Sequence, residues 1–235
     1  MPRFRMSTQI HTVTNELRRR ITSGMYKPGE RLIELQLSAE LGVSRTPIRL
    51  AFEKLTKEGL LERLPKRGFR VRAFDIQEVI NAVDVRGTLE GMAARLAAER
   101  GMTEEDLRIM RDCVQEGQAV LDEAAKRDGL IDGARWSAMN ATFHRVLVRA
   151  AGNSSLEAAL DYISTAPLVG AAELVMHGDR PQLELEFAWR SQQDHVDIVA
   201  ALAQREGSRA ENLMREHARR SRDNKRRLFE EANGH

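Results

Sequence analysis

Three histidines in the second half of the chain have the type and placement of metal ligands. His144, His195 and His217 each fall on the apolar face of a separate predicted helix. A single inward histidine is usually an ordinary core residue, but several buried imidazoles need partners, which a shared divalent cation provides. Asn140 precedes His144 by one helical turn, so its amide oxygen can reach the same point. The sequence therefore predicts a metal site at Asn140, His144, His195 and His217, with plain core histidines as the alternative.

Arg86 is the second residue that could bind a ligand. It lies on an inward-facing stripe with Val79, Val83 and Glu90. A buried guanidinium is costly unless it is paired. Glu90, one turn later, is one possible partner, and the carboxylate of a small ligand beside the metal is the other. The candidate effector-binding residues are Arg86, Glu90 and Asn224.

A third set of residues is basic and lies in the first half of the chain. Arg45 and Arg49 stand one turn apart on a predicted helix, away from its apolar positions. Guanidinium forks in this place can bond to guanine O6 and N7 in a DNA major groove. Arg31 is placed to bind phosphate, which adds affinity without sequence information. The candidate DNA-binding residues are Arg31, Ser44, Arg45, Thr46, Arg49, Lys66, Arg67 and Gly68, and for each one an ordinary solvated surface residue is the alternative.

Residues 1–74 contain the elements that would position these basic residues. Apolar residues recur at helical spacing from Ile10 to Ile21, behind a possible Ser7 or Thr8 cap. Helices are predicted near 34–41 and 45–58, the second with Ser44 as its N-cap, followed by strands at 61–64 and 69–72 around a Pro65–Gly68 turn. A helix, a tight turn, a second helix and a basic hairpin form the layout of a winged helix-turn-helix.

The rest of the chain is predicted to be all α-helical. Strand signals vanish after residue 75, and short connections favour antiparallel neighbours in a bundle. The predicted fold is therefore mainly α: a winged helix-turn-helix at 1–74, a short linker at 75–78 and an all-α antiparallel helical bundle at 79–235. The predicted helices lie near 76–98, 103–126, 135–150, 154–176 (with a possible break at Pro167), 181–205 and 208–231.

Charge separates the same two regions. Residues 1–74 hold 16 Lys or Arg and 7 Asp or Glu, a net charge of +9, whereas residues 75–235 hold 21 and 28, a net charge of −7. A basic first region beside an acidic second one indicates that only the first meets a polyanion. The single Cys113 excludes an intrachain disulfide and suits a reducing compartment. With neither a membrane-length apolar run nor a signal peptide evident, a cytoplasmic location is expected.

The first region resembles the GntR family of bacterial transcription regulators. The resemblance rests on PGERLIE, LGVSRTPIR, EGLL and RGFRV, and it covers about residues 10–73. It implies that Arg45 and Arg49 contact operator bases, since the family carries arginine at both positions. One departure is Leu50, where the family often has glutamate after the second arginine.

The second region resembles the FCD ligand-sensing domain of the FadR-like branch of that family. The phrases VDVRGTLEGMAARLAA, NATFHRVLVRAAGN, QDHVDIVAAL and LMREHARRS carry this resemblance across about residues 79–224. Metal-binding members use an Asp-x-x-x-His pair and two later histidines, which match His144, His195 and His217. Asn140 stands at the aspartate position, so metal affinity should fall or an anionic effector should supply the missing charge. The phrases VRGTLEG and AAGN are most similar to vanillate-responsive repressors, which share this asparagine.

These features together predict a ligand-responsive DNA-binding transcription regulator rather than an enzyme. We expect a repressor of a catabolic operon, released from a palindromic operator by an aromatic acid or another small carboxylate. Its expected partners are duplex DNA, the carboxylate effector, a divalent metal (zinc in the first place) and a second copy in a homodimer. The alternatives are a metal-dependent enzyme that uses the histidines, which the lack of an HExxH motif disfavours, and a constitutive DNA-binding protein with structural histidines.

Overall fold

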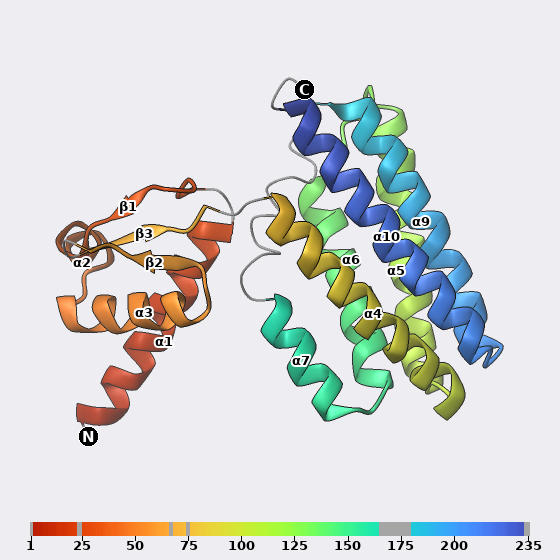
Figure 1. Cartoon of the computed structure of the whole chain (residues 1–235), viewed down its shortest axis with the longest axis horizontal. Helices are drawn as coiled ribbons and strands as arrows, with labels where there is room; N and C mark the ends of the chain where they lie inside the picture. The colour runs from red at the N-terminus through yellow and green to blue at the C-terminus, as the bar shows by residue number, and fades with distance from the viewer. Residues whose placement is uncertain (1, 23–24, 66–67, 74–75, 165–179, 233–235) are drawn as a thin grey trace. The chain divides into compact units, whose positions relative to one another are not determined.

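The structure is a computed structural model that describes residues 2–22, 25–65, 68–73, 76–164 and 180–232. By compactness the chain forms two units that divide between Val79 and Ile80 (Figure 1). Helix α4 (Ile76–Arg100) contains this division, so three of the four residues predicted as a linker are helical. The exact limits of the two predicted domains stay predictions.

The N-terminal unit is a three-helix core with a small sheet. Its helices are α1 (Pro2–Thr22), α2 (Glu34–Leu41) and α3 (Arg45–Lys57). Ile48, Phe52 and Leu55 recur along α3, are fully buried and share one hydrophobic cluster with Leu17 of α1. This burial fixes which side of α3 remains exposed. The helix α1 begins earlier than the predicted Ser7 or Thr8 cap.

Three short antiparallel strands complete this unit. They are β1 (Arg31–Leu32), β2 (Leu61–Arg63) and β3 (Phe69–Val71), in the order β1-β3-β2. Leu61 lies opposite Val71, and Arg31 lies opposite Arg70. The winged helix-turn-helix prediction is therefore confirmed, with a strand at Arg31–Leu32 that the sequence pattern did not indicate.

The C-terminal unit is the predicted all-α bundle. Helix α5 (Glu104–Ala125) packs against α6 (Gly133–Ala150) and α9 (Pro181–Ala203), and α9 packs against α10 (Gly207–Ala232), as the long helices in Figure 1 show. Its core includes the fully buried Phe143, Leu147, Ile198 and Leu202. Pro167 and the end of the predicted 154–176 helix lie outside the described residues. The remaining described helix after α4 is α7 (Ser154–Ser164).

Helices α4 and α10 approach each other very closely at one glycine. A Cβ atom added at Gly87 would lie 2.4 Å from the Cβ atom of Ala218. Real carbon contacts are longer than 3 Å, so only glycine permits this approach without a shift of one helix. The contact places Arg86, the neighbour of Gly87, beside α10.

Candidate functional site

Arg45 and Arg49 lie on the exposed side of α3, as predicted. The preceding Ser44 has the extended backbone of an N-cap (φ −67°, ψ 165°) but makes no side-chain capping bond. Ser44 and Thr46 are exposed beside the two arginines. Arg49 has no ion-pair partner among the described residues, so its guanidinium fork is open to a ligand.

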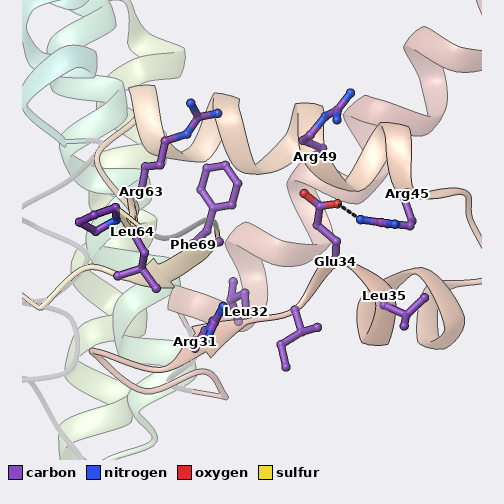
Figure 2. Close-up of a pocket in the computed structure, with 12 residues that line it drawn as sticks. Arg31, Leu32, Glu34, Leu35, Arg45, Arg49, Arg63, Leu64 and Phe69 are labelled. Carbon is purple, nitrogen blue, oxygen red and sulfur yellow. Dashed lines mark hydrogen bonds and ion pairs between the residues drawn. The ribbon is translucent and has the colours of Figure 1, made fainter.

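A groove of about 570 Å³ gathers basic residues from three elements of the N-terminal unit. Figure 2 shows Arg45 and Glu34 turned toward each other, with Arg45 Nη2 3.1 Å from Glu34 Oε2. Arg63 of β2 was missed by the sequence analysis, although it follows the buried Leu61 on a predicted strand. Its guanidinium lies 5.5 Å from the centre of the Phe69 ring. The charged residues that line the groove are Arg31, Glu34, Arg45, Arg49 and Arg63.

Gly68 connects the hairpin to Arg31. Its φ of +121° is strained for any residue with a side chain, and Arg31 Nε would lie 3.3 Å from a Cβ atom there. Glycine therefore lets the Arg31 guanidinium lie against the hairpin backbone. The predicted contacts at Lys66 and Arg67 lie outside the described residues and stay predictions.

The three predicted histidines come together inside the C-terminal unit. His144 of α6, His195 of α9 and His217 of α10 are buried, and each offers a ligand atom within 4.8 Å of the others. An ion with bonds of about 2.1 Å spans ligand atoms up to about 4.2 Å apart, so small side-chain movements would close the set. His195 is fully buried, and neither of its ring nitrogens has a hydrogen-bond partner in the described part of the chain. A buried polar group in this state requires an explanation.

Two buried carboxylates flank this histidine cluster. Glu90 Oε1 lies 3.0 Å from His144 Nδ1, although the angle does not make a hydrogen bond. Asp194 Oδ2 lies 3.3 Å from His217 Nδ1. Each carboxylate also pairs with an arginine, because Arg86 Nε donates to Glu90 over 2.8 Å and Arg220 donates to Asp194. Such carboxylates orient imidazoles that bind metals.

Burial and neighbouring charges shift the pKa values of His195, His144 and Glu90. Burial lowers the pKa of His195 well below its usual range, and His217 and His144 add to the shift. Burial likewise lowers the pKa of His144, which Glu90 partly opposes. Burial alone would raise the pKa of Glu90, but Arg86 and His144 lower it to about 2. At neutral pH His144 and His195 are therefore uncharged, as metal ligands must be.

Not all of the other predicted site residues join the cluster. Asn140 is half-buried on α6, and Asn224 is half-buried on α10, but no hydrogen bond in the described structure links either one to the histidines. Arg86 Nε donates to Glu90, and the terminal nitrogens of Arg86 have no partner among the described residues. Asp194 and Lys225 are further charged residues that sequence reasoning missed. No helix in the described ranges combines the length and apolarity that crossing a membrane requires.

Comparison with known proteins identifies both halves of the chain. Residues 9–71 match the family described as bacterial regulatory proteins, gntR family. Residues 81–220, more than half of the chain, match the FCD domain. The chain belongs to the GntR family and carries an FCD domain. The predicted resemblances to GntR and FCD and the predicted fold class are thereby confirmed.

Individual relatives agree with this GntR assignment. The uncharacterized HTH-type transcriptional regulator YdhC of Bacillus subtilis (strain 168) is 31% identical over 150 residues, which is 64% of each protein. A probable D-xylose utilization operon transcriptional repressor of Paenarthrobacter nicotinovorans is 36% identical over 136 residues, 58% of this chain and 56% of the relative. The chain thus spans less than two thirds of the length of both relatives.

A solved structure has the same fold as this GntR chain. Escherichia coli McbR/YncC superposes with a TM-score of 0.72 at 21% identity, over 96% of this chain and 99% of that one. At this identity the match bears on the fold alone. The family is described as one of bacterial regulatory proteins, which agrees with the prediction of a regulator.

Proposed function

We propose that this chain is a ligand-responsive DNA-binding transcription regulator, and specifically a repressor of a catabolic operon. The observation that carries the proposal is the groove that joins Arg31, Arg45, Arg49 and Arg63. Guanidinium groups along one groove form a surface suited to a polyanion. The relatives support this function, because one is named a transcriptional regulator and the other a transcriptional repressor.

The arginines of the groove would have different roles in DNA recognition. Arg49 is exposed and unpaired in the described structure, so both arms of its fork can meet a guanine edge. Arg45 donates one bond to Glu34, which fixes the direction of its guanidinium. Arg31, against Gly68, is placed for phosphate. Ser44 and Thr46 offer hydroxyl groups, and Lys66 and Arg67 would extend the contact at the hairpin tip.

Two copies of the chain would act together. One winged-helix unit reads only a few base pairs, so a homodimer with twofold symmetry would double the contact and require inverted half-sites. The FCD domain would then hold the two DNA-binding units at the spacing of a palindromic operator.

The effector site proposed for the bundle lies at Arg86. The Nε atom of Arg86 is held by Glu90, and its terminal nitrogens, unpartnered in the described chain, suit the oxygens of a carboxylate. Asn224 would add an amide to the same site from α10. A small organic acid, aromatic or aliphatic, is the ligand class that fits this set.

The imidazole nitrogens of the three buried histidines suit a divalent cation, and zinc is the ion that we propose. His144, His195 and His217 would hold it, and His195 would gain the partner that both its ring nitrogens lack. When bound, the ion would supply a positive anchor for the effector carboxylate. Asn140 brings no charge, so the affinity for the ion should rise when an anionic effector is present.

Effector binding would control DNA binding through a difference in affinity between two arrangements of the domains. An effector that binds one arrangement more tightly shifts the population toward it, and the same coupling weakens effector binding to the DNA-bound protein. Repression would be relieved when the favoured arrangement no longer fits both half-sites.

Fluorescence anisotropy on labelled duplex DNA tests the whole proposal, with the operator selected by the purified protein from random sequences. Arg49→Ala should weaken operator binding by about 1–3 kcal/mol and relax the preference at one base pair. Arg86→Ala should leave operator binding unchanged but remove release by the carboxylates that release the wild type. Arg108→Ala, an exposed bundle arginine paired with Glu105, is the matched control. An operator affinity that Arg49→Ala does not change would contradict the DNA-binding assignment.

A further inference from the structure

Lys225 of α10 is a partly buried cation without a carboxylate partner in the described chain. Its ammonium group donates one hydrogen bond, to Ser221 Oγ at 3.0 Å, and this partner is uncharged. Burial of an ammonium without a counter-charge is unfavourable. A residue in this state marks a place where an anion would be stabilised.

Arg222, on the same helix, is a comparable cation that does have carboxylate partners. Arg222 is also partly buried, but it lies 2.8 Å from Asp84 and 2.9 Å from Asp223. Asp223 and then Asp84 raise the pKa of Arg222 against the effect of burial. Lys225 behaves in the opposite way, because burial first and the charge of Arg86 second lower its pKa to about 8.

Arg86 and Lys225 are thus two like charges brought together by α4 and α10. The close approach at Gly87 and Ala218 and the ion pair of Asp84 with Arg222 lay the stretch of α4 that carries Arg86 along α10 as far as Arg222, within one turn of Lys225. One buried carboxylate, Glu90, serves Arg86, and its Oε1 atom also faces His144. Among the described residues no carboxylate forms an ion pair with Lys225, whose hydrogen bond goes to the uncharged Ser221.

We propose that Lys225 and Arg86 form a two-cation clamp for the carboxylate of the effector. This inference rests on the proposed function, because it adds a second anchor from α10 to the effector site. A clamp of two cations requires a ligand with a full negative charge, so the uncharged amide of the same acid should not bind. Lys225 lies beyond the residues that match the FCD domain, which end at residue 220.

Titration calorimetry on the full-length protein tests the clamp with a panel of small carboxylates. The panel runs from acetate and lactate to succinate, benzoate and vanillate, each beside its amide. The wild type should bind at least one acid and none of the amides. Lys225→Met should bind that acid about 10-fold to 100-fold more weakly, as expected for the loss of a charge-assisted hydrogen bond. Lys225→Arg should restore most of the affinity, and Arg222→Met should change it less than Lys225→Met.

Proton uptake is the second readout of this experiment. Arg86 from α4 acts on Lys225, Ser221 is its partner on α10, and α9, which packs against α10, carries the buried carboxylates Glu184 and Asp194. An anion bound to Lys225 would raise its pKa above the free value, so the wild type should take up a proton on binding near pH 8–9 and lose affinity above it. Lys225→Arg should show neither effect. Calorimetry in buffers of different ionisation enthalpy measures the uptake.

Two results would contradict the two-cation clamp. If Lys225→Met binds the acid as tightly as the wild type while Arg86→Ala does not, the clamp is wrong and the Arg86 site stands. If the wild type binds no acid in preference to its amide, both the clamp and the proposed effector site are wrong. If circular dichroism shows that Lys225→Met is unfolded, Lys225→Gln, which can keep the bond to Ser221, replaces it. The same loss of affinity for the acid is expected.

Discussion

The candidate sites of the two units hold their charged residues in opposite environments. In the winged-helix unit, the Arg45 side chain is 66% exposed and its one carboxylate, Glu34, is 23% exposed. In the bundle, Glu90 is 5% exposed between Arg86 and His144, and His195 is fully buried. The first set meets a partner at the surface, whereas the second set is embedded in a core.

This difference determines how each site can be recognised. Exposed guanidinium groups are hydrated, so an unpaired one such as Arg49 is stable and becomes informative only beside other basic residues in one groove. A buried polar atom without a partner costs about 1–3 kcal/mol, so the two ring nitrogens of His195, which are unpartnered among the described residues, point to a missing ligand on their own. In the bundle, a single buried group without a partner therefore indicates a binding site. In the winged-helix unit, only the arrangement of several basic groups in one groove indicates one.

The largest expected effect comes from removing the buried carboxylate. Glu90→Gln should lower the free energy of unfolding by about 3–5 kcal/mol, because it leaves Arg86 without its buried counter-charge. Urea denaturation at pH 7, followed by circular dichroism, measures the change. Glu105→Gln, which removes an exposed carboxylate 2.7 Å from Arg108, should stay within about 0.5 kcal/mol. Equal losses in both variants would show that burial does not separate the two kinds of ion pair.

The next effect concerns the histidine cluster. Zinc at a free concentration of about 100 times its dissociation constant should stabilise the wild type by about 2.7 kcal/mol, because it binds the folded state alone. His195→Asn should lose most of this gain, while the exposed His11→Asn in the winged-helix unit should keep it. Thermal denaturation with and without zinc measures both. A wild type that zinc does not stabilise, even with a carboxylate present, would leave the histidines as core residues.

Much of the fold could be predicted because its signals are local. The buried face of α3 follows from the spacing of Ile48, Phe52 and Leu55, and the same spacing shows that Arg45 and Arg49 are exposed. The strand at Arg31–Leu32 could not be predicted, since two residues carry no periodicity and the strand exists only by pairing with β3. Its position matters because it brings Arg31 to the groove.

The candidate site was predictable only in part, for the same reason. Helical spacing identified the inward histidines, and the structure brings all three together. Their partners depend on contacts across the bundle, such as Asp194 with His217, which are 23 positions apart. Lys225 was missed because its state depends on what surrounds it: Arg222 forms ion pairs with two acids, whereas Lys225 forms none in the described structure.

The smallest expected effect lies at Glu34 and tests whether a half-buried carboxylate at the surface positions a DNA-reading arginine. Glu34→Gln removes the charge that holds Arg45 but keeps an oxygen that can accept its bond. Stability should change by less than about 1 kcal/mol, as for exposed ion pairs in general. Both variants remove a negative charge from the groove, so both should bind random DNA more strongly. Glu34→Ala also frees the Arg45 guanidinium, so it should in addition weaken the base preference that Arg45 provides and that Arg45→Ala removes. Anisotropy on selected and scrambled duplexes separates the two effects. If Glu34→Ala leaves the ratio of specific to random affinity unchanged, Glu34 does not position Arg45, and the exposed site needs no internal support.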